Sequence, residues 1–239
     1  YIGGGLNYAG AVVAAKHGLK VALIETSLDQ MGGVCLHKGC IPSKMFLHHA
    51  NTIRQSKESV FSGELTLDMK ILTAKKDKLI SSATKAVTAQ CAQFELIEGK
   101  GHIIGAQKVE VEGKIYEAEH LVIGTGSSPF IPDGIAYVGK AILTSDDVLE
   151  LQELPKEIAI YGYGAIGLEM ASFFASTGVH VTLISRDETL LEKSHPLIQS
   201  AMVKQITKLS ITHLKNHVVS SAENTTKGVH VTFDNGTSS

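Results

Sequence analysis

Residues 32–44 of the chain read Gly32-Gly33-Val34-Cys35-Leu36-His37-Lys38-Gly39-Cys40-Ile41-Pro42-Ser43-Lys44. The two cysteines stand five residues apart, and a glycine lies shortly before each of them. Pro42 suits the first turn of a helix, where its missing N–H costs nothing. We therefore expect a loop that leads into a helix, which continues from Ser43 to Gln55.

The spacing of Cys35 and Cys40 is unusual for a structural disulfide. In a regular helix, residues five apart rise about 7.5 Å and lie about 140° apart around the axis. A disulfide needs Cα atoms within about 7 Å, so the pair can join only where the helix start is distorted, which Gly39 permits. Closing so short a ring stabilises the fold by only about 2 kcal/mol, so the pair suits a redox centre better than a structural cross-link. A helix N-terminus would also lower the thiol pKa. Two buried thiols without a redox role remain the alternative.

The composition excludes several classes of protein. The chain has 239 residues, of which 44% are hydrophobic and 19% charged, enough for one large or two medium globular domains. Its 22 basic and 24 acidic residues nearly balance, so the chain has no net positive charge that would attract nucleic acid or an anionic membrane surface. No apolar run approaches the roughly 18 residues of a membrane span. Three cysteines are too few for a secreted disulfide scaffold and favour a reducing, cytoplasmic setting.

A glycine-rich turn opens the chain at Gly3-Gly4-Gly5 and leads into a helix that we expect to end near Gly18. An apolar strand over 21–24 follows, and Glu25 closes it. This is the pattern of a dinucleotide-binding βαβ unit, in which glycines let the backbone approach a pyrophosphate and the acid binds a ribose hydroxyl. The pattern is incomplete, because Tyr8 stands at the third glycine position, and a purely structural turn is the alternative.

A second glycine motif is complete. A strand over 158–161 precedes Gly162-Tyr163-Gly164-Ala165-Ile166-Gly167, and a helix ending near Gly178 and a strand over 179–184 follow. The run from Gly18 to Glu25 is echoed by the run from Gly178 to Ser185. This internal repeat predicts an α/β protein with two Rossmann-like dinucleotide-binding domains, at 1–149 and 150–239.

The segment between the two motifs has its own pattern. Residues 67–94 predict a long helix, whose Lys75, Lys76 and Lys78 we assign to a solvated face, and Cys91 is expected to be a small buried residue. Residues 94–119 alternate apolar and polar side chains and predict a small antiparallel excursion. A strand from Leu121 then ends in Gly124-Thr125-Gly126-Ser127. The histidines His37, His48 and His49 are expected to pack or lie at the surface, and we expect no metal site.

The motif Gly-Gly-x-Cys-Leu-x-x-Gly-Cys-Ile-Pro-Ser-Lys resembles the redox-disulfide motif of the flavin-dependent pyridine nucleotide–disulfide oxidoreductases. Leu36, Ile41 and Ser43 make it look most like that of the dihydrolipoamide dehydrogenases, whereas Val34 stands where the family usually has Thr. The resemblance implies that the first βαβ unit holds FAD and the second a nicotinamide dinucleotide. It also implies that Cys35 is the interchange thiol and that Cys40 faces the flavin.

The resemblance assigns roles to further residues. Lys44 is expected beside the flavin, in an ion pair with Glu169, which matches a family acid near the nicotinamide. The implied catalytic residues are therefore Cys35, Cys40, Lys44 and Glu169. The implied FAD contacts are Gly3, Gly5, Glu25, Gly33, Lys44, Gly101, Thr125, Gly126 and Ser127. The implied nicotinamide-dinucleotide contacts are Gly162, Gly164, Gly167, Ser185 and Arg186.

The choice between NAD and NADP depends on the residues after the second unit's strand. An NAD site usually has Asp or Glu there, but this chain has Ser185 followed by Arg186, which resembles the NADP-using members because guanidinium pairs with a 2′-phosphate. A plain surface arginine is the alternative. An NADPH-driven reductase of glutathione, mercuric ion or another disulfide is therefore a second candidate, and a catalytically silent cofactor-binding module is a third.

Both ends of the chain suggest a fragment. Only Tyr1 and Ile2 precede the first glycine turn, and the strand over 228–233 is followed by a turn at Asp234-Asn235-Gly236 with no returning strand.

His195-Pro196 lacks the acid of the family's His-Pro-x-x-x-Glu base motif, so we assign it to a surface turn. The resemblance implies that the base and a homodimer interface lie in a C-terminal domain, and that the partner is a small-molecule or lipoyl-domain dithiol.

Overall fold

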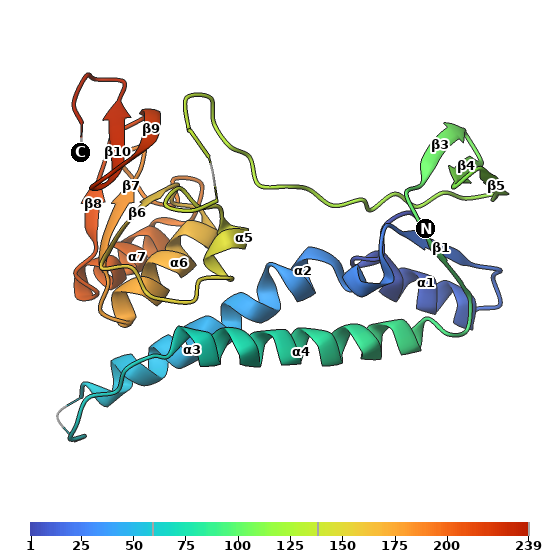
Figure 1. Ribbon diagram of the computed structural model, residues 1–239, viewed down its shortest axis with the longest axis horizontal. Coiled ribbons are helices and arrows are strands. Elements are labelled where there is room, and N and C mark those ends of the chain that lie inside the picture. The colour runs from blue at the N-terminus through green and yellow to red at the C-terminus, as the bar shows by residue number, and fades with distance from the viewer. Residues whose placement is uncertain (59, 138, 239) are drawn as a thin grey trace. The chain divides into compact units, whose positions relative to one another are not determined.

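The fold is a mixed α/β arrangement with parallel and antiparallel sheets (Figure 1). The structure, a computed structural model, describes residues 1–58, 60–137 and 139–238. The contacts divide the chain into two units, Tyr1–Pro42 with Lys75–Ser128 and Ser43–Ala74 with Pro129–Ser239. Helices α3 (Cys40–Ser56) and α4 (Met69–Gln90) contribute residues to both units. The boundary expected at residue 150 separates an FAD-binding domain from a domain that binds the nicotinamide dinucleotide. It stays a prediction.

The first unit contains the βαβ arrangement expected around the first glycine turn. Strand β1 (Ala22–Glu25) pairs in parallel with β2 (Glu95–Glu98), and Ile2 bridges in parallel to both Ile24 and Ile123. Helix α1 (Asn7–Lys16) connects Ile2 to β1. The expected strand from Leu121 is reduced to this bridge, in which Ile2 bonds Val122 and Gly124.

The antiparallel excursion is confirmed for β3 (His102–Gly105), β4 (Lys108–Val111) and β5 (Lys114–Glu117). The prediction was wrong for β2, which is a parallel strand. Leu96 packs in one apolar cluster and Ile97 in another, so both faces of β2 are covered. Consecutive apolar residues of this kind are typical of parallel strands.

The helix predicted over 67–94 is α4, and one of its lysines contradicts the expected solvated face. Lys76 is only 1% exposed, and its ammonium lies 3.2 Å from the Asp77 carboxylate. The reason is helical periodicity, because Lys76 follows the buried Leu72 by one turn and shares its face. Cys91 is fully buried, as expected.

The second unit holds a parallel sheet in the order β6 (Glu157–Tyr161), β7 (His180–Ile184), β8 (Thr212–Leu214). Helix α6 (Ala165–Ser176) connects β6 to β7, and α7 (Pro196–Lys208) connects β7 to β8. The short helix α5 (Ser145–Val148) precedes this sheet. The hairpin of β9 (Val219–Thr225) and β10 (Gly228–Phe233) follows it. Both crossovers run in the same direction along the sheet, which is the βαβ arrangement expected after the second glycine motif.

After β10 the chain turns at 234–236 as predicted. The Phe233 N–H donates to the Thr237 carbonyl at 2.9 Å, and Thr232 bridges to Ser238. The contact is an isolated bridge, and no strand after β10 is found among the described residues, which end at 238. Across the described ranges, no helix combines the length and apolarity needed to cross a membrane.

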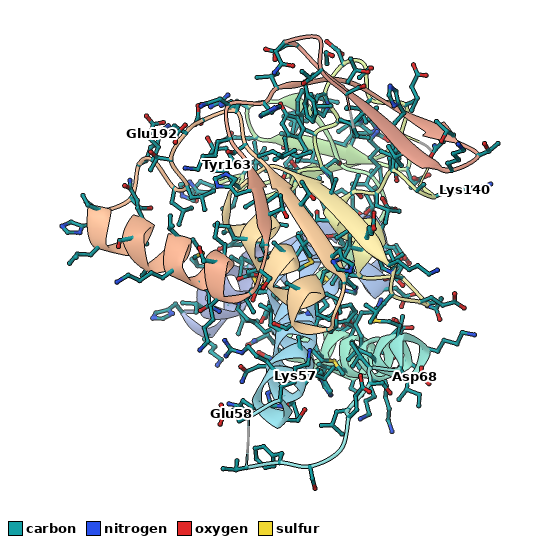
Figure 2. The ribbon with its side chains drawn as sticks, turned by 90° about the vertical axis from the view of Figure 1, so that its left-hand side faces the viewer. Lys57, Glu58, Asp68, Lys140, Tyr163 and Glu192 are labelled. Atoms are coloured by element: carbon teal, nitrogen blue, oxygen red, sulfur yellow. The ribbon has the colours of Figure 1, made fainter. Side chains whose placement is uncertain are left out.

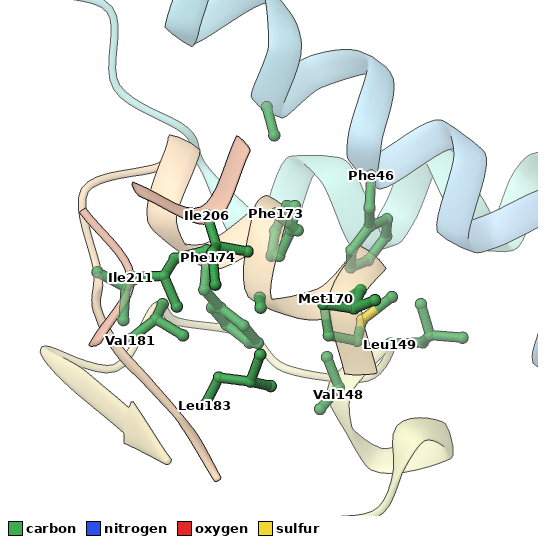
Figure 3. Close-up of a cluster of buried hydrophobic side chains, with 14 of the residues drawn as sticks. Phe46, Val148, Leu149, Met170, Phe173, Phe174, Val181, Leu183, Ile206 and Ile211 are labelled. Carbon is green, nitrogen blue, oxygen red and sulfur yellow. The ribbon is translucent and has the colours of Figure 1, made fainter. Parts of the chain in front are cut away.

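The core of the second unit anchors α6 (Figure 3). Phe173 and Phe174 are fully buried, and Phe174 packs in one cluster with Val181 and Leu183 of β7. Truncating either phenylalanine to alanine would cost about 3–5 kcal/mol, because a cavity would remain. This packing fixes the glycine loop that runs from β6 into α6.

Candidate functional site

Cys35 and Cys40 lie on two successive helices. Cys35 belongs to α2 (Gly33–His37), which follows the 3-10 turn η1 (Leu28–Gln30), and Cys40 is the first residue of α3. The helix is therefore interrupted at Lys38 and Gly39, which confirms the distortion expected there. Both cysteines are thiols in the structure, with Cys40 exposed and Cys35 partly buried.

The two sulfurs interact directly. The Cys35 thiol donates a hydrogen bond to Cys40, and this bond, together with burial, raises the pKa of Cys35. The backbone N–H of Cys40 donates to the Cys35 sulfur and opposes the rise only partly. The expectation of a lowered thiol pKa is therefore wrong for Cys35. The arrangement favours the protonated form of Cys35.

The first glycine loop is held by Glu25 at the end of β1. One carboxylate oxygen of Glu25 accepts from the backbone N–H of Gly4. The other accepts from the backbone N–H and the hydroxyl of Thr26, at 2.7 and 2.8 Å. The acid expected to bind a ribose thus also fixes the loop that would face the pyrophosphate.

The predicted FAD contacts of the first unit are drawn together by backbone packing. Gly3 donates to the Ile24 carbonyl at 2.8 Å, and Gly32 donates to the Gly4 carbonyl at 2.9 Å. A side chain at Gly33 would place its Cβ only 2.6 Å from the Gly5 Cα, so this approach requires glycine. Thr125, Gly126 and Ser127 are exposed next to the bridge of Ile2 and Ile123. Gly101 sits instead over the apolar cluster that contains Ile2, Ile24 and Val109.

Both glycine loops end at helix N-termini suited to a phosphate. Within the part of the chain that the structure describes, neither Leu6 at the start of α1 nor Gly164 at the start of α6 provides a side-chain cap. Uncapped N–H groups and the helix dipole favour an anion at such an end. In the second loop, a Cβ at Gly167 would lie 2.1 Å from the Gly162 carbonyl oxygen, so α6 packs closely on the loop. Tyr163, labelled in Figure 2, occupies the second position of this motif.

Lys44 and Glu169 form the ion pair expected between them. Lys44 lies in the first turns of α3, and Glu169 lies on α6, two residues after the third glycine. The ammonium of Lys44 donates to a carboxylate oxygen of Glu169, and both residues belong to the second unit. Their side chains are 64% and 33% exposed, so the pair is open to solvent and adds little stability by itself.

Ser185 directly follows β7, where the sequence places a nucleotide contact. It is fully buried, whereas the neighbouring Arg186 side chain is 71% exposed and lies 3.3 Å from the Asp187 carboxylate. The Ser185 hydroxyl contacts the His213 ring of β8 at 2.7 Å. His213 is not among the residues that the sequence motifs single out. A third parallel strand after β7 could have indicated it, because such a strand brings its residues to the edge of the sheet where Ser185 lies.

The remaining histidines have structural partners. His37 contacts the Met31 carbonyl at 3.1 Å and the Thr84 hydroxyl at 3.3 Å, and His49 contacts the Met45 carbonyl at 2.8 Å. His195 is exposed as expected, but it caps the N-terminus of α7 and does not lie in a simple turn. Among the described residues, no group of three or more His, Cys, Asp or Glu side chains is arranged to hold a metal ion.

Comparisons with known proteins match these features. The family model of pyridine nucleotide-disulphide oxidoreductases matches residues 2–239. A mercuric reductase from Lysinibacillus sphaericus is 32% identical over 97% of this chain and 44% of its own length. A dihydrolipoyl dehydrogenase from Chlamydia pneumoniae is 31% identical over 95% of this chain and 50% of its own length. The chain thus spans about half the length of these curated relatives.

Solved structures agree with the fold. LpdA from Mycobacterium tuberculosis superposes with a TM-score of 0.89 at 25% identity, over 100% of this chain and 55% of that one. The HOCl-induced flavoprotein disulfide reductase RclA from Escherichia coli gives 0.81 at 25% identity, over 100% of this chain and 53% of that one. The likeness therefore extends through both units.

Proposed function

Because the chain belongs to the pyridine nucleotide-disulphide oxidoreductase family, we propose that it is the nucleotide-binding part of an FAD-dependent dithiol–disulfide oxidoreductase. The activity resembles that of dihydrolipoyl dehydrogenase, with a nicotinamide dinucleotide as electron acceptor. The observation that carries the proposal is the contact of two thiols, Cys35 and Cys40, at the start of a helix in the unit that also contains the first glycine loop.

The chain's own residues perform a thiol–disulfide exchange. With Cys35 and Cys40 joined as a disulfide, a substrate thiolate attacks the Cys35 sulfur, and Cys40 leaves as a thiolate. The second substrate thiol then displaces Cys35, so the substrate becomes a disulfide and the chain holds two electrons. The hydrogen bond from the Cys35 thiol to Cys40 keeps the returning proton on Cys35.

The residues present fit the two nucleotides. Glu25 and the loop at Gly3–Gly5 would hold FAD, with Gly33, Gly101 and Thr125–Ser127 as further contacts. The loop at Gly162–Gly167 would hold the nicotinamide dinucleotide. The support is the pair of uncapped helix N-termini and the close backbone approaches at the loops. FAD would supply the carrier that passes the electron pair between the cysteines and the nicotinamide.

For the acceptor, we propose that NADP(H) is used at least as well as NAD(H). Arg186 offers a planar cation for a 2′-phosphate, and one charge-assisted hydrogen bond contributes about 1.5–3 kcal/mol when sheltered. Arg186 is largely exposed, so the smaller value applies, roughly tenfold in affinity. The comparison of kcat/KM for NADPH and NADH tests this directly, and a preference for NADH above tenfold would refute it.

The whole protein is proposed to be a cytoplasmic homodimer that acts on a small-molecule or lipoyl-domain dithiol. The catalytic base is proposed to come from a segment outside this chain, because His195 caps a helix and lacks the acid of the base motif. An assay of the full-length protein with dihydrolipoamide and with glutathione disulfide, using both nicotinamide cofactors, tests the proposal. No turnover with any dithiol or disulfide would overturn it.

A further inference from the structure

The residue after β7 is joined to β8 through a part-buried polar contact. Ser185 is fully buried, and its backbone N–H donates to the Leu214 carbonyl at 2.9 Å. Its hydroxyl lies 2.8 Å from the Asp187 carbonyl oxygen and 2.7 Å from the His213 Nε2. Two strands and the loop after β7 therefore meet at one oxygen atom.

The direction of each hydrogen bond follows from the groups involved. A carbonyl oxygen only accepts, so the single hydroxyl proton of Ser185 goes to Asp187. His213 must then donate its Nε2–H to the Ser185 oxygen. The neutral ring therefore carries its proton on Nε2, and burial keeps it neutral by lowering the pKa of His213. Ser185 has neither an exposed surface nor a proton left for a ribose hydroxyl.

Charged side chains stand on both sides of this contact. Arg186 follows Ser185 and lies beside Asp187. Lys215 and Asn216, just after β8, donate to the two oxygens of Glu188, at 3.0 and 2.7 Å. The end of β7 and the loop after it are thus joined to β8 and the loop after β8 by two contacts, a part-buried neutral one between Ser185 and His213 and an exposed charged one at Glu188.

We propose that His213 is a positioning residue for the adenosine end of the nicotinamide dinucleotide, acting through its hydrogen bond to Ser185. The bond holds the loop after β7 at the sheet edge, so that Arg186 alone discriminates a 2′-phosphate from a 2′-hydroxyl. Ser185 serves as an internal anchor and does not read the ribose. The inference rests on the proposed function, because it needs a nicotinamide dinucleotide at this edge.

The test uses fragments that probe only the adenosine end. In FAD-loaded full-length protein, calorimetry measures the binding of 2′,5′-ADP and of 5′-AMP. His213→Leu removes the hydrogen bond to Ser185, and Ser185→Ala removes that bond together with the one to Asp187, so both fragments should bind about two- to tenfold more weakly with an unchanged ratio. His213→Gln keeps an N–H donor and should stay within about twofold of the parent. Arg186→Gln should weaken 2′,5′-ADP about tenfold and leave 5′-AMP unchanged.

A second readout is specific to the hydrogen bond. Nitrogen-15 NMR of the His213 ring should show the proton on Nε2 in the parent and a changed tautomer balance in Ser185→Ala. Unchanged binding of both fragments in His213→Leu, or an altered fragment ratio in Ser185→Ala, would overturn this inference alone. Parent protein that binds neither fragment would overturn the nucleotide site of the proposed function as well.

Discussion

The ammonium group of Lys44 pairs with the carboxylate of Glu169, although 125 residues separate them in the chain. Lys44 lies one turn after Cys40 on α3, and Glu169 lies in the first turns of α6, just after the second glycine loop. The pair therefore links α3, the helix that begins with Cys40, to α6, the helix that follows the second glycine loop.

The first prediction concerns this pair. Because its side chains are partly exposed, a double-mutant cycle of Lys44→Met and Glu169→Gln should give a coupling energy of only about 0.2–1 kcal/mol in unfolding. The same single variants in full-length protein should slow electron transfer from a dithiol to the nicotinamide at least several-fold. The exposed pair Lys108–Glu117 is the matched control. Equal effects of both pairs on the transfer rate would contradict a functional role.

The second prediction concerns Glu25. In β1 and β2, Glu25 and Glu98 stand opposite each other in register, each at the end of its strand. Glu25 accepts from the glycine loop, whereas Glu98 accepts from the Leu28 N–H at 3.1 Å. Glu25→Ala should therefore weaken FAD retention on dialysis by roughly tenfold or more, and Glu98→Ala should leave it nearly unchanged. Similar retention in the two variants would count against the placement of FAD.

The third prediction separates fold from binding in the second glycine loop. A Cβ at Gly167 would clash with the Gly162 carbonyl, whereas a Cβ at Gly164 meets no atom within 4 Å among the described residues. Gly167→Ala should lower the unfolding free energy by about 1–3 kcal/mol. Gly164→Ala should fold normally but bind NAD(P)H more weakly, because its methyl group would occupy the phosphate position. Denaturant melts and fluorescence titrations check both, and a stable Gly167→Ala would refute the packing argument.

The fourth prediction is a pH dependence of stability from His213. Burial, and secondarily Lys215, lowers the pKa of His213 in the folded chain, while the unfolded value stays near the ordinary one of about 6.5. Between the two pKa values, the unfolded chain binds more protons than the folded chain. His213 therefore makes the unfolding free energy fall as the pH falls through this range. Below the folded pKa its contribution levels off. His213→Gln should remove this component of the slope. An identical slope in parent and variant would show that His213 does not contribute.

The sequence predicted those parts of the molecule that local chemistry dictates. The two glycine turns, the helices after them and the break at Gly39 follow from backbone freedom, and they appear as expected. The contact of Lys44 with Glu169 was predictable only because a family resemblance linked two distant motifs. The contact of Ser185 with His213 was not, because it depends on the register between β7 and β8.

Two other errors have the same physical origin. Lys76 was assigned to the surface by its charge, but its place in the helical repeat decided its burial. Strand β2 was assigned to the antiparallel excursion by its alternation, but packing on both of its faces made it a parallel partner of β1. In both cases tertiary packing overrode the local pattern.

The central claim is that Cys35 and Cys40 exchange electrons with a bound flavin. An anaerobic reductive titration of the FAD-loaded full-length protein tests it most directly. The account predicts that the parent consumes two electrons per chain beyond those taken by the flavin. A long-wavelength absorption band should appear midway, and Cys40→Ser should lose both the band and the extra equivalents. A parent protein that titrates with flavin equivalents alone, and shows no such band, would contradict the account.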